Sequence, residues 1–168
     1  DMLSLLPEPP VVFPAWESLP KDRSVADAVY GARLRLLQEI ESDQAPRVII
    51  SCIEALLHPV PSRKTVSSST RKIRVGETLE TEEFLGWLVE RGFERTPTIE
   101  RAGEFSIHGG IIDIFPPEAL DPVRIELFGD EVDSIRTFDV ETQRKVASLQ
   151  EAAITAIGQG TVPDKAAA

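Results

Sequence analysis

The chain has 168 residues, of which 28 are acidic and 18 basic, and its formal net charge is −10 at pH 7. That length holds one domain, or one domain with part of another, and a hydrophobic content of 42% is enough for a buried core. The acidic balance argues against an extended DNA-binding face, which would need Lys and Arg, and no run of about 18 apolar residues is present to span a membrane.

Residues 1–64 alternate short strands and helices in the manner of an α/β fold. Residues 11–13 form a short apolar strand, and periodic apolar side chains predict a helix from Ser24 to about Glu41. Residues 47–51 are apolar enough for a strand buried on both faces of a parallel sheet, and residues 53–57 predict a short helix.

Three side chains in this segment carry specific expectations. Ser24 is predicted to cap the helix that follows it, with Asp27 at the capping-box position. Cys52 is the only cysteine, so no intrachain disulfide can form, and its isoleucine neighbours predict a buried, inert thiol. A single reduced thiol fits a cytoplasmic protein.

A change of composition separates this segment from the next unit. Prolines and serines between residues 59 and 69 mark the boundary, although residues 65–75 are themselves predicted to run as a strand. We place the second unit at residues 65–149 and the start of a further segment at residues 150–168. Within the end of the chain, residues 147–157 predict a strand or a short helix.

The second unit begins with a predicted helix at residues 81–91. Thr81 is a candidate N-cap, and Gly92 is a candidate stop just beyond the last turn. The predicted apolar face consists of Phe84, Leu85, Leu88 and Val89.

Successive β-strands are predicted from residue 93 to residue 138, because apolar and polar residues alternate there. In residues 123–128 the odd positions are apolar, and the even positions are Arg124, Glu126 and Phe128. An aromatic side chain near an arginine on one strand face is typical of a protein-binding hot spot. Gly129-Asp130 is a candidate turn, with a bulge or a longer loop beside it.

An ordered series of residues runs from position 101 to position 139. It consists of Arg101-x-Gly103-Glu104-Phe105, Gly109, Asp113-x-Phe115-Pro116, Arg124-x-Glu126-x-Phe128-x-Asp130-Glu131, Ile135 and Phe138-Asp139. This series resembles the UvrA-interaction domain that two bacterial nucleotide-excision-repair proteins share. They are the damage-loading helicase UvrB and the transcription-repair coupling factor (Mfd).

Two further stretches favour the coupling factor. Residues 13–20, Phe-Pro-Ala-Trp-Glu-Ser-Leu-Pro, resemble its Trp-Glu-x-Leu-Pro stretch, and Gln143-Arg144 follows Phe138-Asp139 as in that family. A Pro-Leu-Thr-Gly turn would be usual there in UvrB. A fragment of UvrB is the alternative interpretation.

The resemblance implies a fold of the α+β class. Residues 65–149 would form an antiparallel sheet with a packed helix, like domain 2 of UvrB. Residues 1–64 would be a partial, degenerate RecA-like α/β segment that precedes it.

The resemblance also implies a partner and its contacts. The family binds UvrA through positions that match Arg124 and Phe128, with Glu126 between them, and through a basic position that matches His108. The family commonly has Arg at that last position, and a neutral imidazole cannot form the two-pronged pair that Arg forms with a carboxylate. Two plainer interpretations stay open: Arg124 as an ordinary surface cation and Phe128 as a core aromatic residue.

The function implied by the resemblance is the recruitment of UvrA to a stalled RNA polymerase in nucleotide excision repair. The intact family protein is an ATP-driven DNA translocase that engages polymerase and DNA through other parts. This chain has no Gly-x-x-x-x-Gly-Lys-Ser/Thr motif, so we expect no enzyme activity, and its two distant histidines predict neither a metal nor a cofactor. An acidic-site hydrolase that uses the abundant carboxylates is a competing hypothesis from another class.

Overall fold

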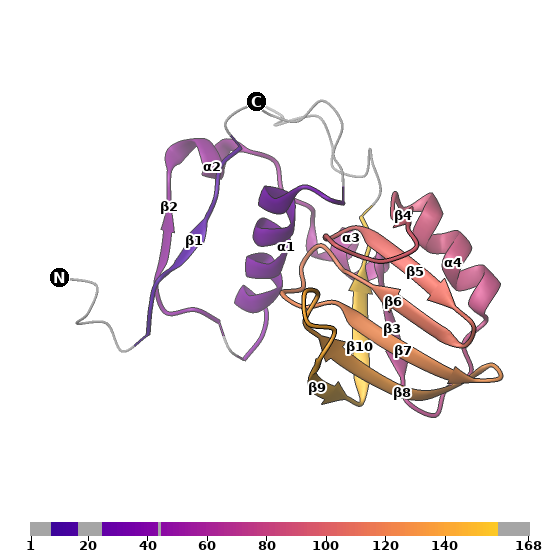
Figure 1. Ribbon diagram of the computed structural model, residues 1–168. Helices are drawn as coiled ribbons and strands as arrows, with labels where there is room; N and C mark the ends of the chain where they lie inside the picture. The colour runs from indigo at the N-terminus through magenta and orange to yellow at the C-terminus, as the bar shows by residue number, and fades with distance from the viewer. Residues whose placement is uncertain (1–7, 17–24, 44, 158–168) are drawn as a thin grey trace.

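The computed structural model describes residues 8–16, 25–43 and 45–157. Helix α1 (Ala28–Ile40) lies between two groups of elements (Figure 1). Strands β1 (Val11–Phe13) and β2 (Ile49–Ser51) with helix α2 (Ile53–Leu57) lie on one side of α1. The remaining strands lie on its other side, with helix α4 (Thr81–Glu90) beyond them.

The first group is the predicted α/β segment. Strands β1 and β2 pair in parallel, with Val11 opposite Ile49 and Phe13 opposite Ser51. Phe13 packs with Leu36 of α1 and Ala55 of α2 in a small buried cluster. This arrangement agrees with the alternation of strands and helices predicted from the sequence.

The N-terminus of α1 differs in detail from the prediction. The helix begins at Ala28, and its N-cap is Asp27, whose carboxylate accepts a hydrogen bond from the Tyr30 main-chain N–H at 2.6 Å. Asp27 also accepts a hydrogen bond from Trp16 Nε1 at 3.0 Å, which ties the segment after β1 to the start of the helix. The predicted cap, Ser24, lies outside the described residues.

The predicted burial of β2 and of Cys52 is wrong. Ile49, Ile50 and Cys52 are exposed to solvent. The cause is tertiary: among the described residues β2 pairs only with β1, and β1 lies between it and α1 (Figure 1). A strand needs elements on both faces to be buried on both, and the described part of the chain supplies none beyond α1 and α2.

The prediction of a strand over residues 65–75 is right only in its second half. Residues 63–68 form helix α3 (Arg63–Ser68), because Ser62 caps it and accepts a hydrogen bond from the Thr65 main-chain N–H at 3.1 Å. Strand β3 (Thr70–Arg74) follows and pairs antiparallel with β10 (Glu151–Thr155).

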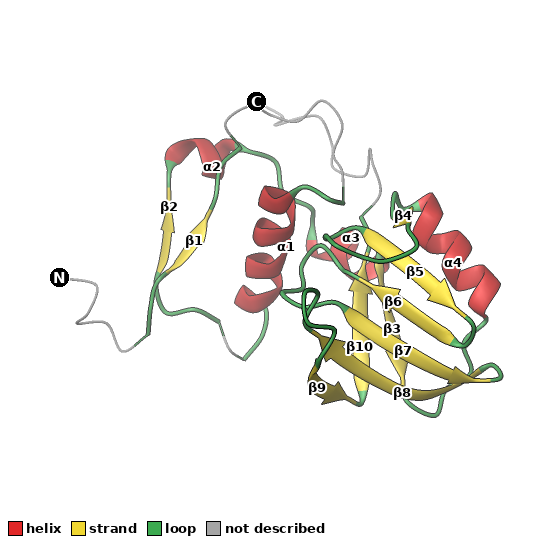
Figure 2. Cartoon of the chain, viewed as in Figure 1, coloured by secondary structure: helices red, strands yellow, loops and turns green. Residues whose placement is uncertain are grey.

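The larger sheet has six strands in the order β4-β5-β6-β7-β8-β9. All neighbours are antiparallel except the short parallel pair β4 and β5. The strands are β4 (Glu94–Arg95), β5 (Glu104–His108), β6 (Ile111–Ile114), β7 (Val123–Phe128), β8 (Glu131–Phe138) and β9 (Lys145–Leu149). Figure 2 shows strands and loops, and no further helix, between α4 and the end of the described residues at position 157, which confirms the predicted α+β class.

Helix α4 (Thr81–Glu90) packs on one face of this sheet through Phe84, Trp87 and Leu88. The sequence correctly places Phe84 and Leu88 on the buried face, but Val89 is exposed and Trp87 is buried in its place. Positions 84, 87 and 88 are spaced i, i+3 and i+4, so they share one face of the helix, and Val89 lies at its edge.

The two ends of α4 show one wrong and one correct prediction. Thr81 is the first helical residue rather than the cap, and Glu80 occupies the N-cap position without a side-chain hydrogen bond. Gly92 has a φ of 90°, a left-handed conformation that suits glycine and ends the helix as predicted.

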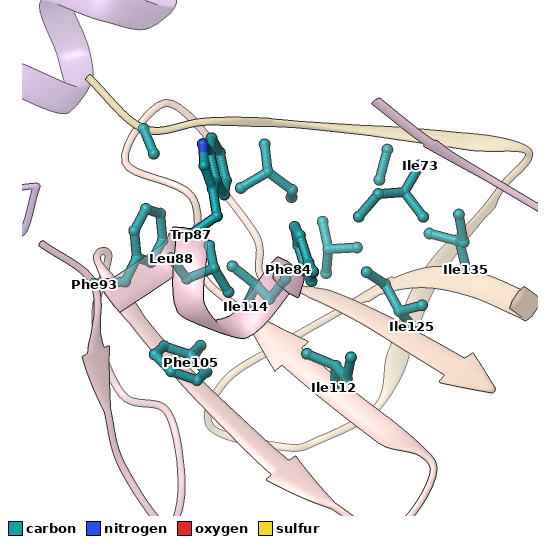
Figure 3. Packing of buried hydrophobic residues seen from close by; sticks show 14 of the residues in the cluster. Ile73, Phe84, Trp87, Leu88, Phe93, Phe105, Ile112, Ile114, Ile125 and Ile135 are labelled. Atoms are coloured by element: carbon teal, nitrogen blue, oxygen red, sulfur yellow. The ribbon is translucent and has the colours of Figure 1, made fainter. Parts of the chain in front are cut away.

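The main hydrophobic core lies between α4 and the two sheets. In Figure 3 the side chains of α4 face those of the six-stranded sheet, with Ile73 of β3 beside them. The sheet contributes fully buried residues from four strands: Phe105, Ile112, Ile114, Ile125 and Ile135. The other face of the same strands, called the outer face below, is therefore free to carry polar side chains.

Candidate protein-interaction surface

Strand β7 separates core residues from surface residues by simple alternation. Ile125 is completely buried and Val123 nearly so, whereas the side chains of Arg124, Glu126 and Phe128 lie on the outer face. The alternation predicted from the sequence is therefore present in the structure.

Cross-strand register brings further side chains beside these three. Asp113 of β6 and Arg136 of β8 lie opposite Arg124 on its two sides. Ser134 of β8 lies opposite Glu126. The register shifts between Glu126 and Leu127, which is the bulge predicted next to the Gly129-Asp130 turn.

Arg124 is held by groups of its own chain. Its Nε donates to Asp113 Oδ1 at 2.6 Å and its Nη2 donates to Asp113 Oδ2 at 2.8 Å, a two-pronged ion pair. Nη2 also donates to Gln143 Oε1 at 3.1 Å, and the guanidinium carbon lies 4.4 Å from the centre of the Phe138 ring. The side chain is 19% exposed, so Arg124 is not an ordinary, freely solvated surface cation.

Phe128 is the last residue of β7, and 84% of it is exposed. It is followed by Gly129, which has a φ of 64° and forms the turn into β8. The interpretation of Phe128 as a core residue is therefore excluded. An aromatic side chain so exposed on an otherwise polar face has no role in the core of this chain.

Glu126, like Arg124, is paired with side chains of its own chain. Its Oε2 accepts a hydrogen bond from Ser134 Oγ at 2.7 Å, and its Oε1 lies 2.7 Å from Arg136 Nη1. The Ser134 hydrogen bond, and then the charge of Arg136, lower the pKa of the Glu126 carboxyl below its ordinary value. Sequence reasoning missed Arg136 because the bulge in β8 hides which of its residues share a face.

His108 ends β5, on the strand separated from β7 by β6. Its Nε2 lies 2.6 Å from the main-chain oxygen of Pro97. Since a carbonyl oxygen only accepts, Nε2 must carry the hydrogen. His108 lies opposite Ile111, which in turn lies opposite Glu126, so all four predicted residues belong to the outer face.

The motif around Arg101 has a structural role. The Glu104 carboxylate accepts hydrogen bonds from the main-chain N–H groups of Glu100 at 2.7 Å and Arg101 at 3.2 Å, and from Arg101 Nε at 2.8 Å. Burial opposes the ionisation of Glu104, but these hydrogen bonds and the Arg101 charge outweigh it and lower the pKa of the carboxyl. Glu104 therefore closes the turn that leads into β5.

The chemistry of the outer face suits recognition better than catalysis. Asp113 and Glu126 are each paired with a guanidinium, so neither is a free acid or base, and the hydrolase hypothesis finds no support here. Within the described ranges no group of three or more His, Cys, Asp or Glu side chains is placed to hold a metal ion. Across the same residues, no helix has the length and apolar character needed to cross a membrane.

Comparison with known proteins gives the family of this chain. The family model of the UvrB interaction domain matches residues 72–158. The chain is 38% identical over 151 residues to the transcription-repair-coupling factor of Bacillus subtilis (strain 168), which covers 89% of this chain and 13% of that relative. It is 50% identical over 92 residues to the protein of the same name from Staphylococcus haemolyticus (strain JCSC1435), covering 55% of this chain and 8% of the relative.

A third relative, the transcription-repair-coupling factor of Staphylococcus aureus (strain bovine RF122 / ET3-1), is 52% identical over 83 residues. That match covers 49% of this chain and 7% of the relative. The chain thus spans 13% or less of the length of these three relatives.

Proposed function

Because the chain belongs to the UvrB interaction domain family, we propose that it is the protein-recognition part of a transcription-repair-coupling factor and that its partner is UvrA. In this proposal it recruits UvrA to a stalled RNA polymerase during nucleotide excision repair, in the cytoplasm. Binding to polymerase and to DNA, and ATP-driven translocation, belong to other parts of the longer protein.

One observation carries the proposal: Phe128 is a large aromatic side chain that is almost fully exposed on the same outer face as the fixed guanidinium of Arg124. Binding hot spots are enriched in aromatic and Arg side chains, and a partner that covers Phe128 gains apolar burial without first breaking any contact. On the same face, Arg124 is paired with Asp113 and Glu126 is paired with Arg136.

The proposal includes a division of the chain. Residues 65–149 are the UvrA-interaction unit, and residues 1–64 are a partial RecA-like α/β segment that helps to present it. Residues 150–168 lead into the next part of the protein. The pairing of β10 with β3 makes residues 151–155 a support for the interaction unit.

We further propose that this chain neither binds nor hydrolyses ATP. The sequence contains no Gly-x-x-x-x-Gly-Lys-Ser/Thr motif, whose main-chain N–H groups and lysine hold a triphosphate in nucleotide-binding loops. Isothermal calorimetry with ATP and Mg²⁺ should give no saturable heat, and saturable binding would contradict this part of the proposal.

The decisive experiment is a titration of purified UvrA with three variants. Phe128→Ala and Arg124→Ala should each weaken binding by about 2 kcal/mol, or roughly 30-fold. Leu120→Ala is the matched control: Leu120 is 75% exposed, but it precedes β7, at the end of that strand opposite to Phe128. It should bind as the parent does.

Thermal unfolding of the same variants separates binding from folding. Phe128→Ala and Leu120→Ala should melt with the parent, whereas Ile125→Ala, which empties a fully buried site, should lose about 2–5 kcal/mol of stability. The proposal fails if the parent chain does not bind UvrA, or if Phe128→Ala binds as tightly as Leu120→Ala.

A further inference from the structure

We propose that Asp113 and Gln143 are positioning residues of this interface, which fix the Arg124 guanidinium so that only its Nη1 edge faces a partner. The inference rests on the proposed function. It adds to the surface two side chains that come from outside β7, one on β6 and one on the loop between β8 and β9.

Most of the hydrogen-bond donors of Arg124 are used within the chain. A guanidinium has five N–H groups, one on Nε and two on each Nη. Asp113 accepts from Nε and from Nη2, and Gln143 Oε1 accepts from the remaining Nη2 hydrogen. In the part of the chain that the structure describes, Nη1 donates no hydrogen bond, so its two N–H groups are available for a partner.

The flat face of the Arg124 guanidinium also has a contact within the chain. Its plane is covered on one side by the Phe138 ring at 4.4 Å, and Phe138 itself is completely buried. The arginine therefore cannot rotate out without losing an ion pair, a hydrogen bond and a ring contact together. A partner meets a group that is already ordered, and the entropy of fixing a long side chain is not lost on binding.

The contacts of Arg124 within the chain restrict the acceptor that a partner can present. A two-pronged pair with a carboxylate uses Nε and Nη2, and Asp113 already occupies both positions. The partner therefore meets only the two N–H groups of Nη1, which point in different directions and cannot form the parallel two-pronged pair. This geometry makes Asp113 a determinant of which partner groups fit.

The loop that carries Gln143 is built to hold that side chain in place. Asp139 Oδ1 accepts hydrogen bonds from the N–H and the hydroxyl of Thr142, both at 2.7 Å, and the Gln143 N–H donates to the Asp139 main-chain oxygen at 2.8 Å. Gln143 Nε2 donates to the Val140 oxygen at 2.9 Å, which turns its Oε1 toward Arg124.

Gln143 also has a φ of 57°, in the left-handed region where side chains other than Gly, Asn and Asp are uncommon. Glycine at position 143 would adopt this φ without strain, but it would not supply the side-chain amide that contacts Arg124. Gln143→Gly should therefore make the folded chain at least as stable as the parent while it weakens the positioning of Arg124.

The test is a UvrA titration combined with thermal melts. Gln143→Gly should bind about 2- to 5-fold more weakly while melting at the same temperature as the parent or higher. Asp113→Asn should bind about 5- to 10-fold more weakly. Asp43→Asn, which changes the net charge equally at an exposed loop position next to α1, should bind as the parent does.

A double-mutant cycle shows whether Asp113 acts through Arg124. In the Arg124→Ala background, Asp113→Asn should cause no further loss of affinity. Two results would overturn the positioning role alone. One is an equal loss of affinity from Asp113→Asn in both backgrounds. The other is parental affinity in Asp113→Asn and Gln143→Gly while Arg124→Ala still binds weakly. A parent chain that does not bind UvrA overturns the proposed function and this inference with it.

Discussion

Gly31 of α1 lies directly against the carbonyl oxygen of Pro117, and a Cβ at position 31 would overlap that oxygen. The contact is part of a larger junction between α1 and the loop that precedes β7. Arg35 Nε donates to the Glu118 main-chain oxygen at 2.6 Å, and Arg35 Nη2 donates to the Ala119 oxygen at 3.3 Å. Glycine at position 31 is therefore what allows the α/β segment to approach the interaction unit.

Gly31→Ala should destabilise the protein, because the added methyl group must displace either α1 or the loop at Pro117. Overpacking of this kind costs about 1–3 kcal/mol. Urea unfolding at pH 7 measures the change.

Gly86→Ala provides the matched control, since Gly86 lies in α4 and a Cβ there would meet nothing within 4 Å. Alanine is favoured over glycine in a helix by up to about 1 kcal/mol, so this variant should be more stable than the parent. Equal effects of the two substitutions would mean that the junction at Pro117 does not restrain α1.

The same junction predicts a pH dependence. Burial raises the pKa of the Glu118 carboxyl from 4.5 to about 7, against a hydrogen bond from the Thr155 N–H at 2.9 Å, and among the described residues its Oε2 has no hydrogen-bond partner. The folded state thus holds a proton that the unfolded state releases above pH 4.5. The contribution of Glu118 to the free energy of unfolding therefore falls as pH rises from about 4.5 to about 7, by at most about 3 kcal/mol.

Glu118→Gln keeps the acceptor for Thr155 but cannot ionise, so it should remove that fall. The difference in unfolding free energy between variant and parent should grow from pH 4.5 to pH 7 and then level off. Measuring both proteins across this range cancels the titration of all other groups. Parallel stability curves would show that Glu118 is not held in its protonated form.

Several parts of the structure follow from short-range patterns in the sequence. Alternation alone places Ile125 in the core and Phe128 outside it, because neighbouring positions of a strand point to opposite faces. Gly92 ends α4 because only the local backbone is involved.

Other features depend on segments far apart in the chain and could not be predicted. The pair of Asp113 and Arg124 needs the register between β6 and β7, and the position of Arg136 needs the bulge in β8. The exposure of Ile50 depends on which elements cover β2, and a run of apolar residues contains no information about that. Sequence reasoning therefore identified β7 as the candidate surface but missed Asp113 and Arg136, which pair with its side chains.

The turn before β5 gives a prediction about folding rather than binding. Glu104→Ala should cost at least about 2 kcal/mol, because it leaves the N–H groups of Glu100 and Arg101 without their acceptor. Glu94→Ala is the control, since its contact with Arg101 is 3.3 Å long and lies in solvent. Thermal melts of the two variants should differ clearly, and similar melting would mean that Glu104 does not close the turn.

His108 occupies a position where the resemblance to the family implies Arg. The Nε2–H of His108 is used by the Pro97 oxygen at 2.6 Å, so the neutral ring offers a partner only the acceptor Nδ1. His108→Arg would place a free, charged fork on the same face as Phe128. We expect UvrA binding to tighten by roughly 3- to 10-fold, in the range of one charge-assisted hydrogen bond. Added salt should reduce this gain, because exposed charges are screened. His108→Gln, which adds no charge, should give neither the gain nor its salt dependence, and an equal gain in both variants would show that charge at this position does not contribute to binding.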